Sequence, residues 1–317
     1  MARSFFVVLL LFAAVVVKAQ FDPQFSQNMF NQLTYNPGYA GSSGMFNLSA
    51  INRQQWVGFE GAPKTTVFGA DANLNLFKRE SGLGLVFVSD EIGPFKNQMI
   101  SFKYAYRIDL ETGSVGLGLG VGMINQTLDG TTLDPLGGTD GNTYHSKDDP
   151  AIPMAKVTGM ALDMSLGAFY ESAKYYAGFS VNHLNKPSPN FDDEFETYLK
   201  PTFYINGGVR LKMKKHPVVL VPSLYVKTDF AALQVDVNMN AIIRDKYWGG
   251  LTYRHQDAIV LLAGMELLTG LKIGYSYDIT ISRLSSYSSG SHEVMIGYSF
   301  DLNLEKRTKR YKSVRYL

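Results

Sequence analysis

Histidine, aspartate and glutamate are the side chains through which this sequence could hold a metal ion or move protons. The five histidines fall one to a segment, and no two have the i,i+2 or i,i+4 spacing that places ligands side by side on a strand or helix. The chain has no cysteine, which excludes disulfides and thiolate metal sites. The sequence therefore predicts no metal site and no cofactor. The histidines are His145, His183, His216, His255 and His292.

Acidic residues gather in two places that could attract cations. Asp134, Asp148 and Asp149 flank the run Asp140-Gly141-Asn142, but the complete twelve-residue pattern of a calcium loop is not present. The run 192–194 is expected to be an acidic surface loop. We interpret both stretches as solvated loops, with calcium binding in the first as the less favoured alternative.

Nucleophilic catalysis has little support in the sequence. Serine, histidine and aspartate are present, but no Gly-x-Ser-x-Gly turn presents a serine as a nucleophile. The prediction is that the chain is not an enzyme. A lipase or protease is kept as the third hypothesis for its function.

The composition points away from nucleic acid and towards a membrane surface. The formal net charge is +2 and no basic block interrupts the body of the chain, whereas nucleic-acid-binding domains carry a basic patch or stripe. The chain has 19 tyrosines and 20 phenylalanines. Tyrosine combines an apolar ring with a polar tip, which suits a strand surface at a membrane–water boundary.

The first residues have the pattern of an export signal. Arg3 provides a positive start, Phe5 to Val17 is an apolar run, and Val17-Lys18-Ala19 precedes the expected cleavage before Gln20. A membrane anchor is the alternative, but the run is shorter than the about 20 residues that a spanning helix needs. Residues 1–19 are therefore predicted to be a cleaved signal peptide. No later apolar stretch is long enough for a membrane helix, so a membrane form would have to be a closed barrel.

From about residue 45 to residue 302, apolar and polar residues alternate in segments that end in turn signals. Residues two apart in a strand share a face, so each segment has one apolar face and one polar face. At helical spacing the same residues would scatter around a cylinder. The clearest apolar face consists of Leu271, Ile273, Tyr275, Tyr277, Ile279 and Ile281.

The repeat predicts an all-β fold, a transmembrane antiparallel up-and-down β-barrel of about 14 strands. An even number of strands returns the chain to the side from which it started, as in bacterial outer-membrane barrels. A soluble β-sandwich is the alternative, but the length and number of the strands favour the barrel. The strands are expected near 45–55, 65–76, 82–90, 97–109, 114–127, 157–171, 174–184, 200–213, 217–228, 231–244, 246–256, 258–268, 270–283 and 290–302.

The lengths of the connections give the barrel an orientation. Tight turns such as 110–113 and 268–270 follow even strands, while the two longest connections, 128–156 and 185–199, follow odd strands. Outer-membrane barrels have short periplasmic turns and longer loops outside. The first strand is therefore predicted to start in the periplasm.

Four glycines alternate with apolar residues in one expected strand, at Gly116, Gly118, Gly120 and Gly122. A nucleotide-binding loop would need a helix directly after the glycines, and none is expected here. The favoured interpretation is a strand whose inner face has no side chains. Such a face leaves room for something packed in the lumen.

Two regions lie outside the repeat. Residues 20–44 are rich in Gln, Asn and aromatics and alternate too poorly for a strand, so they are predicted to be an N-terminal plug in the lumen or a periplasmic cap. The basic stretch 303–317 is predicted to be a periplasmic tail, either solvated or docked on an acidic partner. The predicted organisation is thus 1–19 signal peptide, 20–44 plug or cap, 45–302 barrel and 303–317 tail.

The start of the mature chain carries motifs that are similar to those of a known family. These are the runs 22–27, 29–31 and 35–41, followed by Arg53-Gln54-Gln55-Trp56 and the closing 291–300. Through them the chain resembles the PorP/SprF family, with Gly38 where that family more often has alanine. The candidate partner-binding or plug residues are Asp22, Pro23, Gln24, Phe25, Ser26, Gln27, Tyr35, Asn36, Pro37, Tyr39, Arg53 and Trp56.

The resemblance implies a function in the outer membrane. It implies a non-enzymatic component of the type IX secretion system of Bacteroidetes, linked in some members to gliding motility, which helps secreted proteins with C-terminal sorting domains reach or stay at the surface. The implied partners are periplasmic lipoprotein ring components and secreted adhesins, with outer-membrane lipid around the barrel and no nucleic acid. The alternative is a transport barrel for small or hydrophobic molecules, with 20–44 as its hatch.

Overall fold

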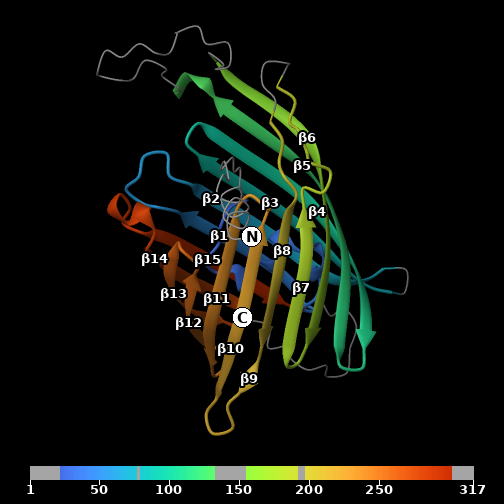
Figure 1. Ribbon diagram of the computed structural model, residues 1–317. Coiled ribbons are helices and arrows are strands. Elements are labelled where there is room, and N and C mark those ends of the chain that lie inside the picture. Colours follow the sequence, from blue (N-terminus) through green and yellow to red (C-terminus); the bar gives the residue numbers. More distant parts are fainter. Residues whose placement is uncertain (1–21, 77–78, 133–154, 192–196, 302–317) are drawn as a thin grey trace, which may run out of the picture.

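The computed structural model describes residues 22–76, 79–132, 155–191 and 197–301. Strands make up most of this part of the chain (Figure 1). They are β1 (Phe46–Gln54), β2 (Lys64–Leu76), β3 (Arg79–Ile92), β4 (Phe95–Leu110), β5 (Gly113–Asp129), β6 (Lys156–Ser172), β7 (Tyr175–Asn182), β8 (Thr202–Val209), β9 (Leu211–Lys212), β10 (Val218–Thr228), β11 (Leu233–Ile243), β12 (Tyr247–Arg254), β13 (Ala258–Leu268), β14 (Leu271–Thr280) and β15 (Ser291–Phe300).

The strands form one closed antiparallel barrel. Each strand pairs with its neighbour in the chain, and β1 pairs with β15, which closes the sheet. β8 and β9 are two parts of one wall strand, because both pair with β10. The wall therefore has 14 strands, which confirms the predicted fold. The predicted segments coincide with the observed strands, and the single segment predicted at 200–213 contains both β8 and β9.

The wall has an apolar outer face and a polar inner face, as the alternation predicts. On β4, Phe102 is 52% exposed, whereas its neighbour Lys103 is 1% exposed. The outer face carries large apolar side chains on every side of the barrel, among them Phe68, Leu85 and Leu119. A surface of this kind suits the hydrocarbon of a bilayer.

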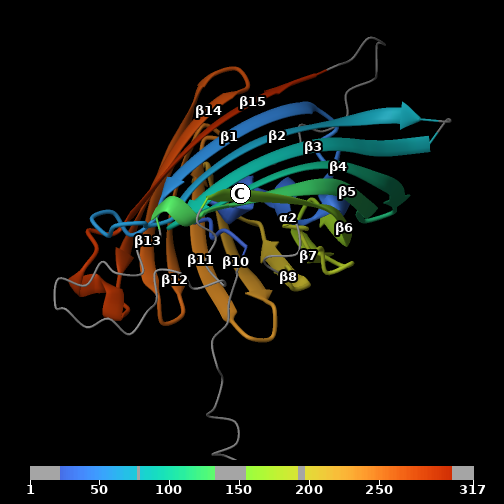
Figure 2. The same ribbon diagram turned by 90° about the horizontal axis from the view of Figure 1, so that it is seen from above.

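Residues 22–44, called the lumenal segment below, lie along the inner face of the barrel. They form three short helical turns, η1 (Asn28–Phe30), α2 (Gln32–Tyr35) and η2 (Pro37–Tyr39). The view along the barrel shows α2 surrounded by strands (Figure 2). Met29 and Leu33 belong to a buried apolar cluster with wall residues such as Val67. The absence of a strand here agrees with the sequence, but the helical turns were not predicted.

The two ends of the barrel differ in their connections. At one end the turns are short, as at 111–112, 244–246 and 269–270, and at the other end 183–201 and 281–290 are long. The second end is called the outer end below, because the sequence predicts that it faces the outside. In the part of the chain that is described, no helix is both long and apolar enough to cross a membrane.

Several predictions made from the sequence concern residues outside the described ranges. The signal peptide at 1–19, the tail at 303–317, the acidic run 192–194 and the calcium-loop candidate at 134–149 lie outside the described residues. The signal peptide, the basic tail and the two solvated acidic loops, with calcium binding as the alternative in the first loop, therefore stay predictions. A further η4 turn (Arg283–Ser286) lies in the connection between β14 and β15.

Candidate lumenal binding site

Positively charged side chains on the inner wall bind backbone carbonyls of the lumenal segment. Because each of these side chains is buried, the carbonyls take the place of water as its hydrogen-bond acceptors. The contacts run along the whole segment. They are Lys227 Nζ to Asp22 O (2.6 Å), Arg254 Nη2 to Phe25 O (3.0 Å), Lys103 Nζ to Leu33 O and Thr34 O (2.6 Å each) and Arg107 Nη1 to Ala40 O (3.3 Å).

A buried ionic network surrounds Ser26. Arg53 on β1 bonds to Asp278 on β14 (2.8 Å) and Glu293 on β15 (3.2 Å). Arg254 on β12 bonds to the same Asp278 (3.1 Å). The Ser26 hydroxyl donates to Asp278 (2.6 Å), and the Ser26 amide donates to Glu293 (2.8 Å). The network thus ties the lumenal segment to strands on both sides of the seam where β1 meets β15.

The network continues to two further groups. Asp236 on β11 accepts a hydrogen bond from Arg254 Nε (3.0 Å). The Gln27 amide donates to Glu293 Oε1 (2.8 Å). Charges buried this deeply are costly unless each is paired and hydrogen-bonded, and the lumenal segment supplies part of that hydrogen bonding.

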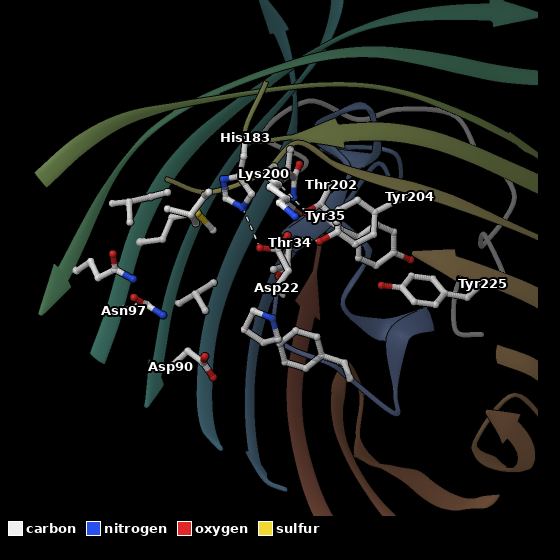
Figure 3. Close-up of a pocket in the computed structure, with 18 residues that line it drawn as sticks. Asp22, Thr34, Tyr35, Asp90, Asn97, His183, Lys200, Thr202, Tyr204 and Tyr225 are labelled. Carbon is white, nitrogen blue, oxygen red and sulfur yellow. Dashed lines mark hydrogen bonds and ion pairs between the residues drawn. The ribbon is translucent and has the colours of Figure 1, made fainter. Parts of the chain in front are cut away.

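His183 binds the start of the lumenal segment (Figure 3). It follows β7, and its ring lies between two carboxylates, with Nε2 2.8 Å from Asp22 Oδ1 and Nδ1 2.9 Å from Asp163 Oδ1. The Tyr204 hydroxyl also donates to Asp22. Burial by itself would lower the pKa of His183, but the charge of Asp22 and the hydrogen bonds that the ring donates to both carboxylates raise this pKa to about 10.

The pKa of Asp22 is shifted in the opposite direction and is lowered. Burial by itself would raise its pKa, but the charge and the hydrogen bond of His183, together with the charge of Lys227, hold the pKa of Asp22 well below its usual range. The Asp22–His183 contact is therefore an ion pair at neutral pH. It fixes the position of Asp22, the first described residue of the lumenal segment.

The glycines of β5 make room for η2. A Cβ atom on Gly118 would lie 2.2 Å from the Gly38 nitrogen, and one on Gly116 would lie 2.1 Å from the Gly38 oxygen. Asn36 caps the turn by accepting from the Gly38 amide (2.9 Å) and donates to the wall carbonyl of Ala168 (3.0 Å). The prediction that the bare face of this strand accommodates something in the lumen is confirmed.

A comparison with models of known protein families identifies the family of this chain. The model of the family described as type IX secretion system membrane protein PorP/SprF matches residues 17–298. The chain belongs to the PorP/SprF family. No curated protein gave a significant sequence match.

Solved structures similar to this PorP/SprF protein are outer-membrane barrels. The CymD monoaromatic hydrocarbon channel has 13% identity, a TM-score of 0.45, and coverage of 87% of this chain and 92% of its own. Omp33 of Acinetobacter baumannii has 7% identity, a TM-score of 0.43, and coverage of 82% of this chain and 99% of its own. Outer membrane phospholipase A of Escherichia coli has 8% identity, a TM-score of 0.38, and coverage of 88% of this chain and 98% of its own. At this level of similarity the comparison concerns the barrel fold alone.

Most of the predicted site residues of this PorP/SprF protein meet inside the barrel. Asp22, Ser26, Gln27 and Arg53 belong to the polar contacts described above. Tyr35 packs against the rings of Tyr204 and Tyr225, Tyr39 packs edge-on against Phe169, and Asn36 and Pro37 contact the glycine-lined wall. Pro23 and Phe25 line a cavity, and Gln24 accepts a hydrogen bond from Gln55.

Trp56 is the exception. It lies in the outer connection after β1, where its backbone amide donates to Ser291 Oγ (3.1 Å). Among the described residues, no hydrogen bond or ring contact joins Trp56 to the lumenal segment. The role of all twelve residues in partner binding stays a prediction.

The wall residues that hold the lumenal segment were missed by sequence reasoning. Lys103, Lys227, Arg254 and Asp278 stand on the polar faces of strands, which the alternation identifies as inward. Inward charges in a narrow barrel must be paired, and that rule could have marked them as a group. Which of them meet depends on the closure of the barrel, which the sequence does not show. Among the described residues, no cluster of three or more His, Asp or Glu side chains could hold a metal ion.

A cavity remains between the lumenal segment and the outer end. It contains about 850 Å³ of space, part of which is open to solvent. One side is formed by the segment, with Asp22, Pro23 and Tyr35, and the other side by β3, β4 and β5 (Figure 3).

Proposed function

We propose that this PorP/SprF protein is a non-enzymatic outer-membrane component of type IX secretion. It helps proteins with C-terminal sorting domains to leave the cell or to stay attached to its surface. The observation that supports this proposal is the lumenal segment, which wall cations and the Ser26 network hold from end to end.

The fixed segment argues against passage through the barrel. Removing it would take away the carbonyls that accept hydrogen bonds from Lys103, Lys227 and Arg254, and a hydrogen bond that involves a charged group contributes about 1.5–3 kcal/mol. The segment therefore acts as a plug, and a secreted protein is bound at an end of the barrel or beside it. This arrangement fits a component that holds other proteins better than one that conducts them.

The proposed partners belong to opposite ends of the barrel. Secreted adhesins with sorting domains contact the outer end, where the long connections lie. Periplasmic lipoprotein ring components contact the end with short turns, and the basic stretch 303–317 is predicted from the sequence to be a periplasmic tail. Attraction of an acidic surface by the six Lys and Arg residues of that stretch would be screened by salt.

The test is a gene deletion complemented with two forms of the protein. Proteins with sorting domains are expected to disappear from the surface and the medium of the deletion strain, measured by mass spectrometry of both fractions, and to return with the full chain. Normal display in the deletion strain would contradict the proposal.

The second form ends at residue 302 and keeps every strand. It is expected to reach the outer membrane in normal amount and to recover adhesins, but not ring lipoproteins, after gentle detergent extraction and affinity purification. A barrel that purifies alone from several detergents would instead favour transport.

The cavity at the outer end is the observation that favours the second candidate function, a transport barrel for small or hydrophobic molecules. Its mixture of polar and apolar walls could accept such a molecule. Transport would require the lumenal segment to move, and uptake that is lost on mutation of the cavity would support it.

A further inference from the structure

Amide side chains line the cavity at the outer end, and their oxygens lack hydrogen-bond donors. Asn97 on β4 stands directly opposite Gln126 on β5, and Asn182 is the last residue of β7. All three line the cavity, with Gln126 1% and Asn182 6% exposed. The amide oxygen of each is buried and has no donor. Because a buried polar group without a partner is costly, these amides point to a ligand that hydrogen-bonds with them.

An amide can bind a ligand through either end of its terminal group. The oxygen accepts hydrogen bonds and the nitrogen donates them, and a rotation of the group by 180° exchanges the two ends. A hydroxyl both donates and accepts, so it can pair with either end. A carboxylate or a phosphate ester only accepts and would leave the amide oxygens unpaired. The amides therefore favour a ligand with several hydroxyl groups.

Asp90 on β3 adds a further acceptor to this row. It stands directly opposite Asn97, is 3% exposed and lines the cavity. Its Oδ1 accepts a hydrogen bond from the Thr65 hydroxyl (2.5 Å). The hydrogen bonds among the described residues do not use its Oδ2, so this oxygen can accept one from a ligand hydroxyl.

The charges around the cavity are balanced. Asp22 is paired with His183, and the charge of Lys227 acts on Asp90. Lys200 also lines the cavity, and Figure 3 shows Lys200 and His183 across the cavity from Asp90 and Asn97. Each carboxylate that lines the cavity thus has a cation near it. The site therefore suits a neutral ligand better than an ion.

An apolar row lies beside the polar one. Val88, Met99 and Ile124 stand opposite one another on β3, β4 and β5, two residues further into the barrel, and all three line the cavity. A ligand at this place meets hydrogen-bonding groups along one edge and an apolar wall beside them. The space of about 850 Å³, part of it open to solvent, lies within the roughly 300–1,000 Å³ of small-molecule sites.

We propose that this cavity binds a neutral mono- or disaccharide. Ring hydroxyls of the sugar pair with Asp90, Asn97 and Gln126, and the C–H face of the ring packs on Met99 and its apolar neighbours. A sugar combines the features that the site requires, since it is uncharged, carries adjacent hydroxyls on its edge and has apolar faces. The proposal goes beyond the secretion function, because the ligand is a small molecule and not a secreted protein.

The test is a binding measurement on the full chain with defined sugars. The protein is purified from the outer membrane in a detergent without a sugar headgroup, and glucose, galactose, N-acetylglucosamine and maltose are titrated with saturation-transfer NMR as the readout. At least one of them is expected to bind with a millimolar or lower Kd. Glucosamine and glucuronic acid, which carry a charge, should bind more weakly than the neutral sugars.

Variants of the amide row locate the binding. Gln126→Leu and Asn97→Leu each remove one hydrogen-bonding partner of the sugar and should raise the Kd about tenfold. Gln98→Leu is the matched control, because Gln98 neighbours Asn97 on β4 and the alternation directs it to the outer face; its Kd should equal that of wild type. Both test variants should fold, since leucine removes a buried amide oxygen that has no donor.

Failure of all four neutral sugars to bind wild type at about 50 mM would overturn the proposal. Equal Kd values in wild type, Gln126→Leu and Asn97→Leu would also overturn it, because the sugar would then bind elsewhere. Tighter binding of a charged analogue would show that the site takes an ion. None of these results bears on secretion of client proteins, so this inference and the proposed function fail separately.

Discussion

Arg53 and Glu293 stand directly opposite each other on the first and last strands, and both also contact Ser26. One cluster of side chains therefore joins the closure of the barrel to the position of the lumenal segment. Arg254 extends this cluster to Asp236 and Asp278. Loss of one side chain from this cluster should weaken both the closure of the barrel and the attachment of the lumenal segment.

Replacing Arg254 with methionine tests this coupling. Arg254→Met leaves the buried carboxylates of Asp236 and Asp278 short of a partner, and breaking a buried pair in this way costs about 3–5 kcal/mol. The free energy of unfolding, measured by guanidinium titration in detergent, should fall by that order. Arg79→Met is the matched control, because Arg79 is exposed, and it should change little. Equal losses in the two variants would contradict the central role of the network.

His183 gives a prediction about pH. Its pKa is higher in the folded protein (about 10) than the ordinary 6.5, so its ion pairs stabilise the fold fully below about pH 6.5. That contribution is lost as the pH rises from 6.5 through about 10. For Asp22, whose pKa is lowered by folding, the contribution is lost as the pH falls below the ordinary 3.8.

The measurement is an NMR titration of the histidine ring carbon-bound protons in detergent, with His183→Gln used to assign the signal. The His183 signal should titrate near pH 10, and Asp163→Asn should move the titration lower because one of the hydrogen bonds that raise the pKa is lost. Titration of this signal near 6.5 would show that the ring is not between the two carboxylates.

Among the elements, β5 and η2 show how sequence and packing are matched. The alternate glycines of β5 are a local sequence pattern, and they correctly predict a strand with an open inner face. The sequence predicts only that something packs in the lumen against this face and does not identify the group. It is the Pro37–Tyr39 turn, whose backbone approaches the strand more closely than any side chain on β5 would allow.

A single added methyl group should displace this turn. Gly118→Ala places a Cβ atom 2.2 Å from the Gly38 nitrogen and from the Pro37 carbonyl carbon, so either the strand or η2 must shift. Gly249→Ala is the control, because its nearest atom is at 3.5 Å. The reporter is Trp248, which packs on Phe30 of the lumenal segment at 5.2 Å between rings. A red shift of Trp248 fluorescence is expected for Gly118→Ala, and equal spectra for both variants would contradict the close packing.

The whole molecule combines a barrel of intermediate size with the segment that we propose as its plug. Fourteen strands fall between small barrels filled by side chains and the open 16- to 18-stranded porins. The extra interior space is taken by the lumenal segment and by the charged side chains that bind it.

Conductance in a planar bilayer tests the closed lumen. The purified wild-type barrel should show no stable conductance steps, because the segment and its salt bridges occupy the pore. A variant that lacks residues 22–44 should conduct if it assembles, and Arg254→Met, which keeps the whole chain, should show brief openings. Steady conductance of the wild type, equal to that of the deletion variant, would mean that the segment does not close the barrel.

The sequence by itself determined the all-β fold, the strands, the inward and outward faces and the family resemblance. These follow from the period-two alternation and from short motifs, both of which are local properties of the chain. The tertiary structure decided which inward charges meet. Arg53, Asp278 and Glu293, for example, are brought together by the pairing of the first strand with the last. Contacts of this kind depend on how the sheet closes and on its register, and no local pattern encodes them.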